Sequence, residues 1–276
     1  MDRVTIGNVE ITAMVDSRAL LNPHFFFPEH AEEMRAEFHD QLDERALLPI
    51  SITTYLLRSR GKNILVDTGV GPRRRPNLPR GKLDETLAAA GIAPEEIDVI
   101  VHTHLHVDHV GWNTVDGEDG LRFFFPRAQH HVNRVEWEYW TTPERVADPE
   151  QPHLAQCVVP LADSGRLHLY DGETALDEEI TFLPTPGHTP GHVAVGIYSA
   201  GERAVIIGDA SHHPVHLVHP DWSPTADSDP VQSAKTRTRL IEEATADGRT
   251  WLAGHWPYPG MGRIVLLGGK RVFQAL

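Results

Sequence analysis

The chain has 276 residues, 40% of them apolar, which fits one compact domain over residues 1–276. Its 25 Lys and Arg against 39 Asp and Glu give a formal charge of −14, which argues against nucleic acid and anionic membranes as partners. No window is apolar enough to span a membrane and no signal segment is visible, so we expect a cytoplasmic protein. The single cysteine, Cys157, has apolar neighbours that favour a buried structural thiol over a nucleophile.

The N-terminal part contains short runs rich in branched side chains, which are typical of strands. A turn at Arg60-Gly61 joins two of these runs into a predicted hairpin. One apolar run after the first predicted helix indicates a buried strand. The predicted strands are residues 9–15, 51–57, 62–66 and 97–101, and the predicted helix is residues 82–90.

The C-terminal part alternates strands with helices, and its last helix has the clearest ends. Asp229 can cap that helix, Pro230 suits its first turn and Gly248 follows its last turn. Spacings of three and four residues predict a buried face made of Val231, Ala234, Thr238, Ile241 and Thr245. Helices are predicted at 132–140, 153–161 and 231–246, and strands at 180–183, 193–198, 204–207, 250–252, 263–267 and 270–273.

Three segments show neither the three-to-four-residue spacing of a helix nor the alternation of a strand, and they are predicted to be long loops: 21–30, 71–80 and 211–229. The last of them holds four histidines and Trp222, a composition that favours a loop packed beside a functional site. Arg73-Arg74-Arg75 in the second segment is interpreted as a solvated charge run rather than an anion site.

His104, His106, Asp108 and His109 lie within six residues, directly after the apolar run 97–101. In an extended segment alternate side chains point to the same side, so His104 and His106 can bind one metal ion. The turn that follows can direct Asp108 and His109 towards a second ion. The motif predicts a metal site, and taken alone it leaves a solvated His-rich loop open as the alternative.

Other apolar runs also end at residues that can bind metal. The runs before His188, Asp209 and His255 all resemble strands, and a fourth run leads to Asp67. Loops at the ends of buried strands are held by a rigid sheet and still face solvent, where catalytic groups are commonly placed. Glycine stands beside His188, Asp209 and His255, which fits chain that turns sharply. This repetition favours one shared site.

Five segments, in this order, resemble the successive motifs of the metallo-β-lactamase superfamily. They are Leu65-Val66-Asp67-Thr68-Gly69, His104-Leu105-His106-Val107-Asp108-His109, Gly187-His188-Thr189-Pro190-Gly191-His192, Gly208-Asp209 and Gly254-His255. The resemblance covers residues 50–268. It implies an α/β fold, a four-layer αββα sandwich in which two sheets face each other and two metal ions lie at one edge.

The resemblance also implies roles for individual residues. One ion would be bound by His104, His106 and His188, and the other by Asp108, His109 and His255. Asp209 would bridge the ions, and Asp67 would orient ligands by hydrogen bonds without binding metal. The implied ions are divalent, zinc in the first place, with manganese, cobalt or iron as substitutes.

Two features indicate which branch of the superfamily the chain resembles. Asp209 disfavours antibiotic hydrolysis, because true β-lactamases of this superfamily lack a bridging carboxylate at that place. The tail 254–262 looks like the methyl parathion hydrolase branch, which lies close to the N-acyl homoserine lactonases. Quorum-quenching lactonases carry a tyrosine three residues after the bridging aspartate, whereas this chain has His212, as in the parathion hydrolase-like branch.

The implied function is a metal-dependent hydrolase that cleaves an ester-type bond in a lactone, carboxylic ester or phosphotriester of a small apolar molecule. A hydroxide that bridges the ions would be the nucleophile. Asp108 would pass a proton to the leaving group, and His212 would hydrogen-bond the developing oxyanion. For His212 the sequence leaves an alternative open, a loop histidine bound to backbone.

Aromatic side chains near these motifs suit an apolar substrate. Residues 25–27 and 123–125 are phenylalanine triplets, and Trp112, Trp222 and Trp256 follow motifs or lie in predicted loops. Such triplets are more often core or dimer contacts than pocket walls, so a homodimer stays an open expectation.

Three other functions stay open at this point. An iron-dependent persulfide dioxygenase uses the same scaffold with one iron, and metal content separates it from a dinuclear hydrolase. A glyoxalase II-like thioesterase is a second alternative, although only residues 73–75 form a basic cluster suited to a glutathione carboxylate. A metal-dependent binding protein without catalysis is disfavoured, because the set of ligands is complete.

Overall fold

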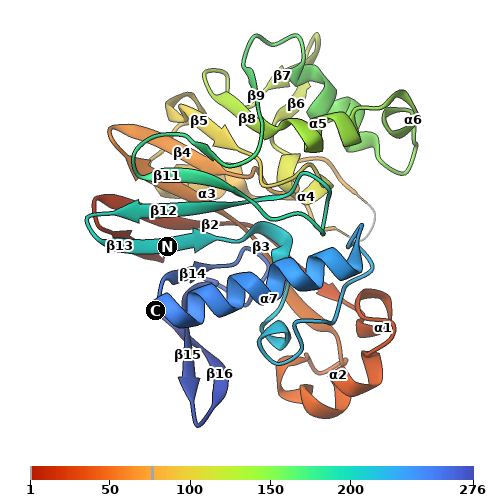
Figure 1. Cartoon of the computed structure of the whole chain (residues 1–276). Helices are drawn as coiled ribbons and strands as arrows, with labels where there is room; N and C mark the ends of the chain where they lie inside the picture. The colour runs from red at the N-terminus through yellow and green to blue at the C-terminus, as the bar shows by residue number, and fades with distance from the viewer. Residues whose placement is uncertain (1, 76–77) are drawn as a thin grey trace.

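Two seven-stranded sheets form the centre of the computed structural model, which describes residues 2–75 and 78–276 (Figure 1). The first sheet has the order β1-β2-β3-β4-β5-β8-β9, antiparallel as far as β4 and parallel from β4 onward. Its strands are β1 (Arg3–Ile6), β2 (Val9–Leu21), β3 (Leu48–Ser59), β4 (Lys62–Val66), β5 (Val99–Val101), β8 (Gln129–Asn133) and β9 (Leu167–Tyr170).

The second sheet runs in chain order from β10 to β16, with one parallel pair between β13 and β14. A separate pair, β6 (Thr114–Gly117) and β7 (Gly120–Phe123), forms a small antiparallel hairpin. The strands of the second sheet are β10 (Thr174–Ala175), β11 (Ile180–Pro184), β12 (Val193–Ser199), β13 (Glu202–Ile206), β14 (Thr250–Leu252), β15 (Met261–Leu267) and β16 (Lys270–Ala275).

Helices cover the outer faces of both sheets. The α-helices are α1 (Pro23–Phe26), α2 (Ala31–Glu37), α3 (Leu83–Ala89), α4 (Val107–Val110), α5 (Arg134–Trp140), α6 (Pro143–Val146) and α7 (Pro230–Asp247). Shorter turns are η1 (His39–Gln41), η2 (Pro94–Glu96), η3 (Leu154–Val158), η4 (Val159–Leu161), η5 (Gly208–Ala210) and η6 (Pro214–Leu217).

Alternation of side chains along the strands builds the layers. Ile64 and Val66 of β4 belong to the core between the sheets, whereas Leu65 packs with Leu83 and Leu87 of α3. On the second sheet Val205 packs with α7, which lies across the outer face of this sheet in Figure 1. The order helix, sheet, sheet, helix confirms the predicted αββα sandwich.

The predicted buried face of α7 was right at Ile241 and wrong at Val231, and Ala234, Thr238 and Thr245 are only half-buried. Val231 is 65% exposed, whereas Ser233, Arg237, Leu240 and Ala244 are buried. Arg237 is buried because its guanidinium hydrogen-bonds carbonyls and a carboxylate, a pattern that a search for apolar spacing overlooks. The predicted ends are confirmed: Asp229 accepts from Gln232 N, and Gly248 is left-handed with φ of 66°.

Two helix predictions needed correction. Residues 132–140 begin with the end of β8, which pairs with β5, and the helix starts only after Asn133, whose side chain accepts from Val135 N. Residues 153–161 form two short turns, η3 and η4, because Pro160 has no backbone N–H to continue one helix. The strands β1, β6, β7, β9 and β10 were not predicted.

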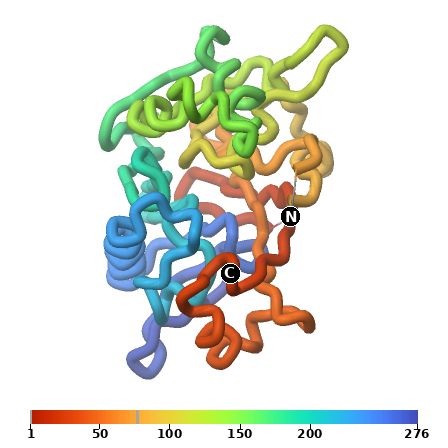
Figure 2. Tube along the Cα trace, turned by 90° about the vertical axis from the view of Figure 1, so that its right-hand side faces the viewer, coloured from red at the N-terminus to blue at the C-terminus, as the bar shows by residue number. Residues whose placement is uncertain are grey.

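Different segments of the chain form the two ends of the molecule. Figure 2 shows the green segment with α5 and α6 at one end, and the orange segment with α1 and α2 and the blue β15–β16 hairpin at the other. Predicted loop 21–30 contains α1, and predicted loop 211–229 contains η6. In predicted loop 71–80, residues 76 and 77 lie outside the described part. Among the described helices, none combines the length and apolarity needed to cross a bilayer.

Candidate metal centre

The predicted ligands gather at one edge of the sandwich because each follows the end of a strand. β5 leads to His104 and His106, and α4 then presents Asp108 and His109. β11, β13 and β14 end shortly before His188, Asp209 and His255, respectively. All seven predicted ligands therefore come together in two groups: His104, His106, His188 and Asp209, and then Asp108, His109 and His255.

The first group has the spacing of a closed coordination shell. His106 Nδ1 lies 3.0 Å from His104 Nε2 and 2.9 Å from His188 Nε2. Asp209 Oδ2 lies 3.7 Å from His104 Nε2 and 3.3 Å from His188 Nε2. Tetrahedral zinc with bonds of about 2.0–2.1 Å requires donor atoms about 3.3 Å apart, so these four side chains fit one ion.

The second group shares Asp209 with the first. Asp209 Oδ1 lies 3.2 Å from His109 Nε2 and 3.1 Å from His255 Nε2. Asp108 completes the group, with Oδ2 3.6 Å from His255 Nε2 and Oδ1 3.9 Å from His109 Nε2. One oxygen of Asp209 faces each group, which is the arrangement that a bridging carboxylate needs.

The buried polar atoms of this cluster support a metal ion independently. His109 Nε2 and Asp209 Oδ1 are fully buried and have no hydrogen-bond partner among the described residues. Buried polar groups without partners are costly in free energy, and imidazole with carboxylate is a donor set that zinc and related ions bind. The residues present therefore fit two divalent ions.

Hydrogen bonds to the nitrogen that faces away from the cluster orient several of the ligand rings. His109 Nδ1 donates to Asp67 Oδ2 at 2.8 Å, and His255 Nδ1 donates to the Ser51 carbonyl at 2.8 Å. Asp67 also accepts from Thr103, whose hydroxyl lies 3.1 Å from His104 Nδ1. With the proton on Nδ1, the Nε2 lone pair points towards the cluster. Asp67 thus lies where its predicted orienting role requires.

Asp227 is an orienting residue that the sequence analysis missed. Its carboxylate accepts from His188 Nδ1 at 2.9 Å and from the buried guanidinium of Arg237 at 3.0 Å. Burial opposes ionisation of Asp227, but His188 and Arg237 outweigh it and lower the pKa to about 2. The loop 211–229 was correctly predicted to pack beside the site, but no motif marks this aspartate.

Glu136 and His192 connect the metal-binding loops to the scaffold. Glu136 is buried and accepts from Leu105 N at 3.0 Å and Gly191 N at 3.0 Å, which joins the first histidine loop to the loop of His188. His192 Nε2 accepts from Asp209 N at 2.9 Å. These bonds fix the backbone beside the ligands.

The electrostatics of the cluster centre on Asp209. Burial raises the pKa of this carboxyl, but His109, His255 and the other surrounding rings hold it well below its usual range. Burial lowers the pKa of His188, yet Asp209 and Asp227 outweigh this and raise it to about 9. The carboxylates therefore create a buried site that favours positive charge.

His212 lies on the cavity side of Asp209. Its Nε2 is 3.1 Å from Asp209 Oδ2, its ring stacks parallel to His255 with centroids 5.6 Å apart, and Phe26 contacts it edge-on. Its buried Nδ1 has no partner among the described residues, so the structure gives no backbone bond of the kind that the alternative interpretation required.

A cavity of about 750 Å³ opens over the cluster. Its base is formed by His106, Asp108, His188, Asp209, His212 and His255. Its apolar walls are Leu21, Phe25, Phe26, Ile50, Leu78 and Trp140. Such a site can hold a small, largely apolar molecule with its reactive bond at the ligands.

The aromatic predictions were only partly right. Phe25 and Phe26 line the cavity, whereas Phe27 and Trp222 belong to a neighbouring core cluster. Trp112 packs on Phe124 and donates to Asp16, and Trp256 packs against Trp251. Trp140, which no motif marked, supplies the aromatic wall instead. Cys157 is buried as predicted.

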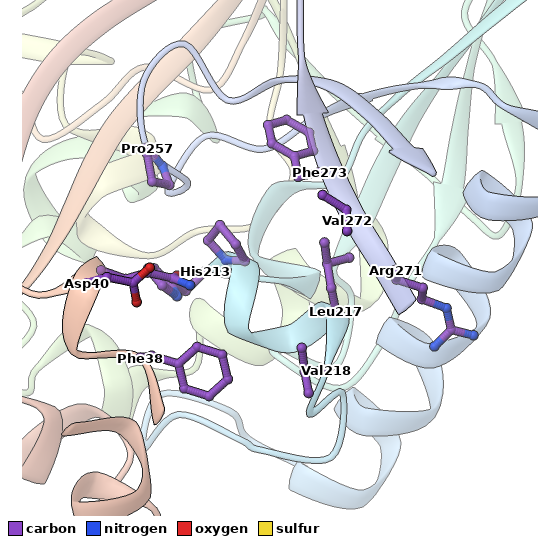
Figure 3. A pocket seen from close by; sticks show the side chains of 11 residues that line it. Phe38, Asp40, His213, Leu217, Val218, Pro257, Arg271, Val272 and Phe273 are labelled. Carbon is purple, nitrogen blue, oxygen red and sulfur yellow. The ribbon is translucent and has the colours of Figure 1, made fainter. Parts of the chain in front are cut away.

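A second cavity, of about 560 Å³, lies between η1, η6 and β16 (Figure 3). Phe38, Leu217, Val272 and Phe273 make it largely apolar, and His213 points into it. It contains none of the seven clustered residues. The consecutive residues His212 and His213 thus line different cavities.

Comparison with known proteins gives one family and several relatives. The model of the metallo-beta-lactamase superfamily matches residues 47–115 and 123–270. An N-acyl homoserine lactonase of Bacillus thuringiensis is 25% identical over 227 residues, 76% of this chain and 82% of the relative. Another, from Bacillus sp, is 27% identical over 184 residues, and the match spans 66% of its length. Acyl-coenzyme A thioesterase MBLAC2 of Gallus gallus is 25% identical over 234 residues, 80% of this chain and 78% of the relative.

Solved structures superpose over nearly the whole chain. The hydrolase AbOPH of the beta lactamase superfamily has a TM-score of 0.85 and 27% identity, with 99% of this chain and 96% of that chain covered. AidC, described as a dizinc quorum-quenching lactonase in complex with a product, has a TM-score of 0.85 and 24% identity, with 100% and 97% covered. At that identity AidC shows the fold alone.

Proposed function

Because this chain belongs to the metallo-β-lactamase superfamily and is a hydrolase of its lactonase type, we propose that it cleaves an ester-type bond of a small, largely apolar molecule at its dinuclear divalent-metal site. Asp209 carries this proposal, since one oxygen faces each group of ligands. The His and Asp donors favour zinc, with manganese, cobalt or iron as substitutes. We rank lactones as the first candidate substrates because several relatives are named lactonases. Carboxylic esters and phosphotriesters are the next candidates.

Two divalent ions, when bound, lower the pKa of a shared water and polarise the substrate oxygen that becomes negative. The protein's own residues orient the substrate and move the proton. Asp108 has a side chain that is 19% exposed and lies on the cavity floor, where it can pass a proton to the leaving group. The His212 imidazole faces the same space and can donate to the developing negative charge.

A thioester is the second candidate substrate class. MBLAC2, an acyl-coenzyme A thioesterase, is similar over most of this chain, and a thioester presents the same carbonyl to the ligands. The cavity offers apolar walls to either acyl group. The choice between these classes therefore needs turnover measurements.

A substrate screen tests the proposal. Protein stripped of metal and reloaded with zinc is incubated with N-acyl lactones, aryl esters, acyl thioesters and phosphotriesters, and Asp209→Ala is treated in parallel as the background. We expect lactone or ester hydrolysis that depends on added metal and is lost in the variant. Oxygen consumption with a persulfide and no hydrolysis in any class would instead support a dioxygenase.

We further propose that the partners are small molecules, without nucleic acid or membrane, that the protein acts in the cytoplasm, and that it forms a homodimer. The charge of −14 supports the exclusion of polyanions. Light scattering of purified protein would distinguish a dimer from a monomer, and cell fractionation would test the location.

A further inference from the structure

The three consecutive arginines 73–75 have three different environments. Arg73 is mostly enclosed: its guanidinium donates to Asp116 at 2.8 Å and to the Thr114 carbonyl at 2.8 Å. Arg74 is exposed. Arg75 lines the cavity above the metal centre. The prediction of one solvated charge run therefore holds only for Arg74, and Arg75 needs its own explanation.

Arg75 brings a positive charge to the wall of this cavity. In residues 2–75 and 78–276 no carboxylate lies within ion-pair distance of it, and its buried Nε has no hydrogen-bond partner. The polar contacts of its Nη2 are long: 3.5 Å to Gln156 Oε1 and 4.0 Å to Cys157 Sγ. Burial lowers its pKa, which is the energetic sign of a cation that has lost water without gaining an anion.

His153 lies on the same wall with a second unused polar atom. The ring is 5% exposed, and its buried Nε2 has no partner among the described residues. Burial and, to a smaller extent, the nearby charge of Arg75 together lower the pKa of His153 to about 4, so the ring is neutral at physiological pH. The ring also hydrogen-bonds the Leu105 backbone, so the neutral His153 completes the wall beside Arg75 without adding charge to it.

We propose that Arg75 and His153 form a subsite for a carboxylate on the substrate, at the end of the molecule away from the bond that is cleaved. This inference rests on the proposed hydrolase function and refines it: the substrate is an apolar ester or lactone whose tail carries one carboxylate. The guanidinium supplies charge and planar donors, and the neutral His153 lines the wall beside it.

The distribution of charge around the cavity supports a carboxylate over a cation. Asp108 and Asp209 are committed to the metal groups, and Glu150 is an exposed residue at the cavity wall. A carboxylate-bearing tail would give the Arg75 guanidinium an anion, whereas a purely apolar tail would leave this cation without one. Charged hydrogen bonds of this kind contribute about tenfold to hundredfold to binding.

Paired ester substrates test the subsite. Mono-4-nitrophenyl esters of dicarboxylic acids of increasing length are compared with 4-nitrophenyl alkanoates of equal length, using the zinc-loaded full chain. We expect kcat/KM to favour the carboxylate ester by about tenfold or more at the best length, mainly through KM. Arg75→Gln should bring the ratio of kcat/KM for the carboxylate ester to kcat/KM for the alkanoate of equal length close to one, and Arg75→Lys should restore part of the preference.

Arg74→Gln is the matched control, because it removes the same charge from the neighbouring exposed position and should leave the preference intact. Binding supplies a second readout: free dicarboxylates should inhibit alkanoate hydrolysis more weakly in Arg75→Gln. A wild-type enzyme that prefers the neutral esters, or an equal preference in Arg75→Gln, would overturn the subsite. Failure to hydrolyse either series would instead overturn the proposed function.

Discussion

Asp209 holds the two groups of ligands together, whereas Asp67 acts through His109 and Thr103. We expect Asp209→Ala to lose metal and nearly all activity, because no other carboxylate of residues 2–75 and 78–276 faces both groups. Asp67→Asn should retain both ions with about 10- to 100-fold weaker affinity or activity, as is typical when an orienting hydrogen bond to a ligand is removed. Metal analysis and kcat/KM of both variants measure this difference. Equal, mild effects with intact metal content would show that the two roles are misassigned.

His212 is the residue expected to stabilise the negative charge that develops on the substrate above the metal centre. His212→Ala should keep both ions, because the ring is not needed to complete either group, but should lose about tenfold or more in catalytic efficiency. Aryl esters and phosphotriesters should be affected at least as strongly as lactones. Steady-state kinetics on each class, beside metal analysis, provide the test. Unchanged kinetics on every substrate would make His212 an ordinary loop residue.

The sequence predicted the ligands and the orienting residue Asp67, but not the other residues around them. His104, His188 and His255 could be found because each follows a strand end and stands in a motif. Asp227, Arg75 and His153 lack any such signal, since their roles arise only when distant loops meet at the cavity. The Ser51 carbonyl that orients His255 is a backbone group and leaves no trace in the sequence.

The contact between the His188 loop and the start of α7 controls one side of the site. Gly187 has φ of 135°, and a Cβ there would lie 2.3 Å from Ser233 N, while the Gly187 carbonyl accepts from Asp229 N. Gly187→Ala should push α7 and His188 apart, lowering both thermal stability and zinc affinity. Calorimetry and a zinc titration measure the two effects.

Gly172→Ala is the control for this prediction. Gly172 also has a positive φ, 61°, but its Cβ would meet nothing within 4 Å, so only the backbone strain of about 1–2 kcal/mol remains. Its zinc affinity should match the wild type. Equal zinc affinity in both variants would mean that the loop tolerates the added methyl group.

At the level of helices and strands, periodicity was informative only where one face is apolar. The hairpin at Arg60-Gly61 and the ends of α7 followed from turn and capping chemistry. The buried face of α7 could not be predicted from apolar spacing, because Arg237 is buried through its hydrogen bonds. β8 was mistaken for helix, since its five residues include a single apolar side chain, Val132, which is too few to reveal the alternation of a strand.

The fold as a whole buries many neutral histidines, which makes its stability sensitive to acid. His213 is 1% exposed, and burial lowers its pKa to about 3. In the unfolded chain this group takes up a proton near its usual pKa, so stability falls as the pH drops below that value towards about 3. His213→Gln should lessen the fall in Tm between neutral and acid pH. His39→Gln, at an exposed position, should leave the fall in Tm unchanged. An equal fall in Tm for the wild type, His213→Gln and His39→Gln would show that His213 does not cause the acid sensitivity.

Two metal ions per chain are the central requirement of the account, because seven side chains form two groups that share only Asp209. Elemental analysis of gently purified protein, combined with native mass spectrometry and a zinc titration of the metal-free chain, measures the number directly. We expect saturation at two divalent ions per chain, with hydrolysis appearing as both groups fill. Saturation at a single ion, or full hydrolysis without metal, would contradict the dinuclear hydrolase.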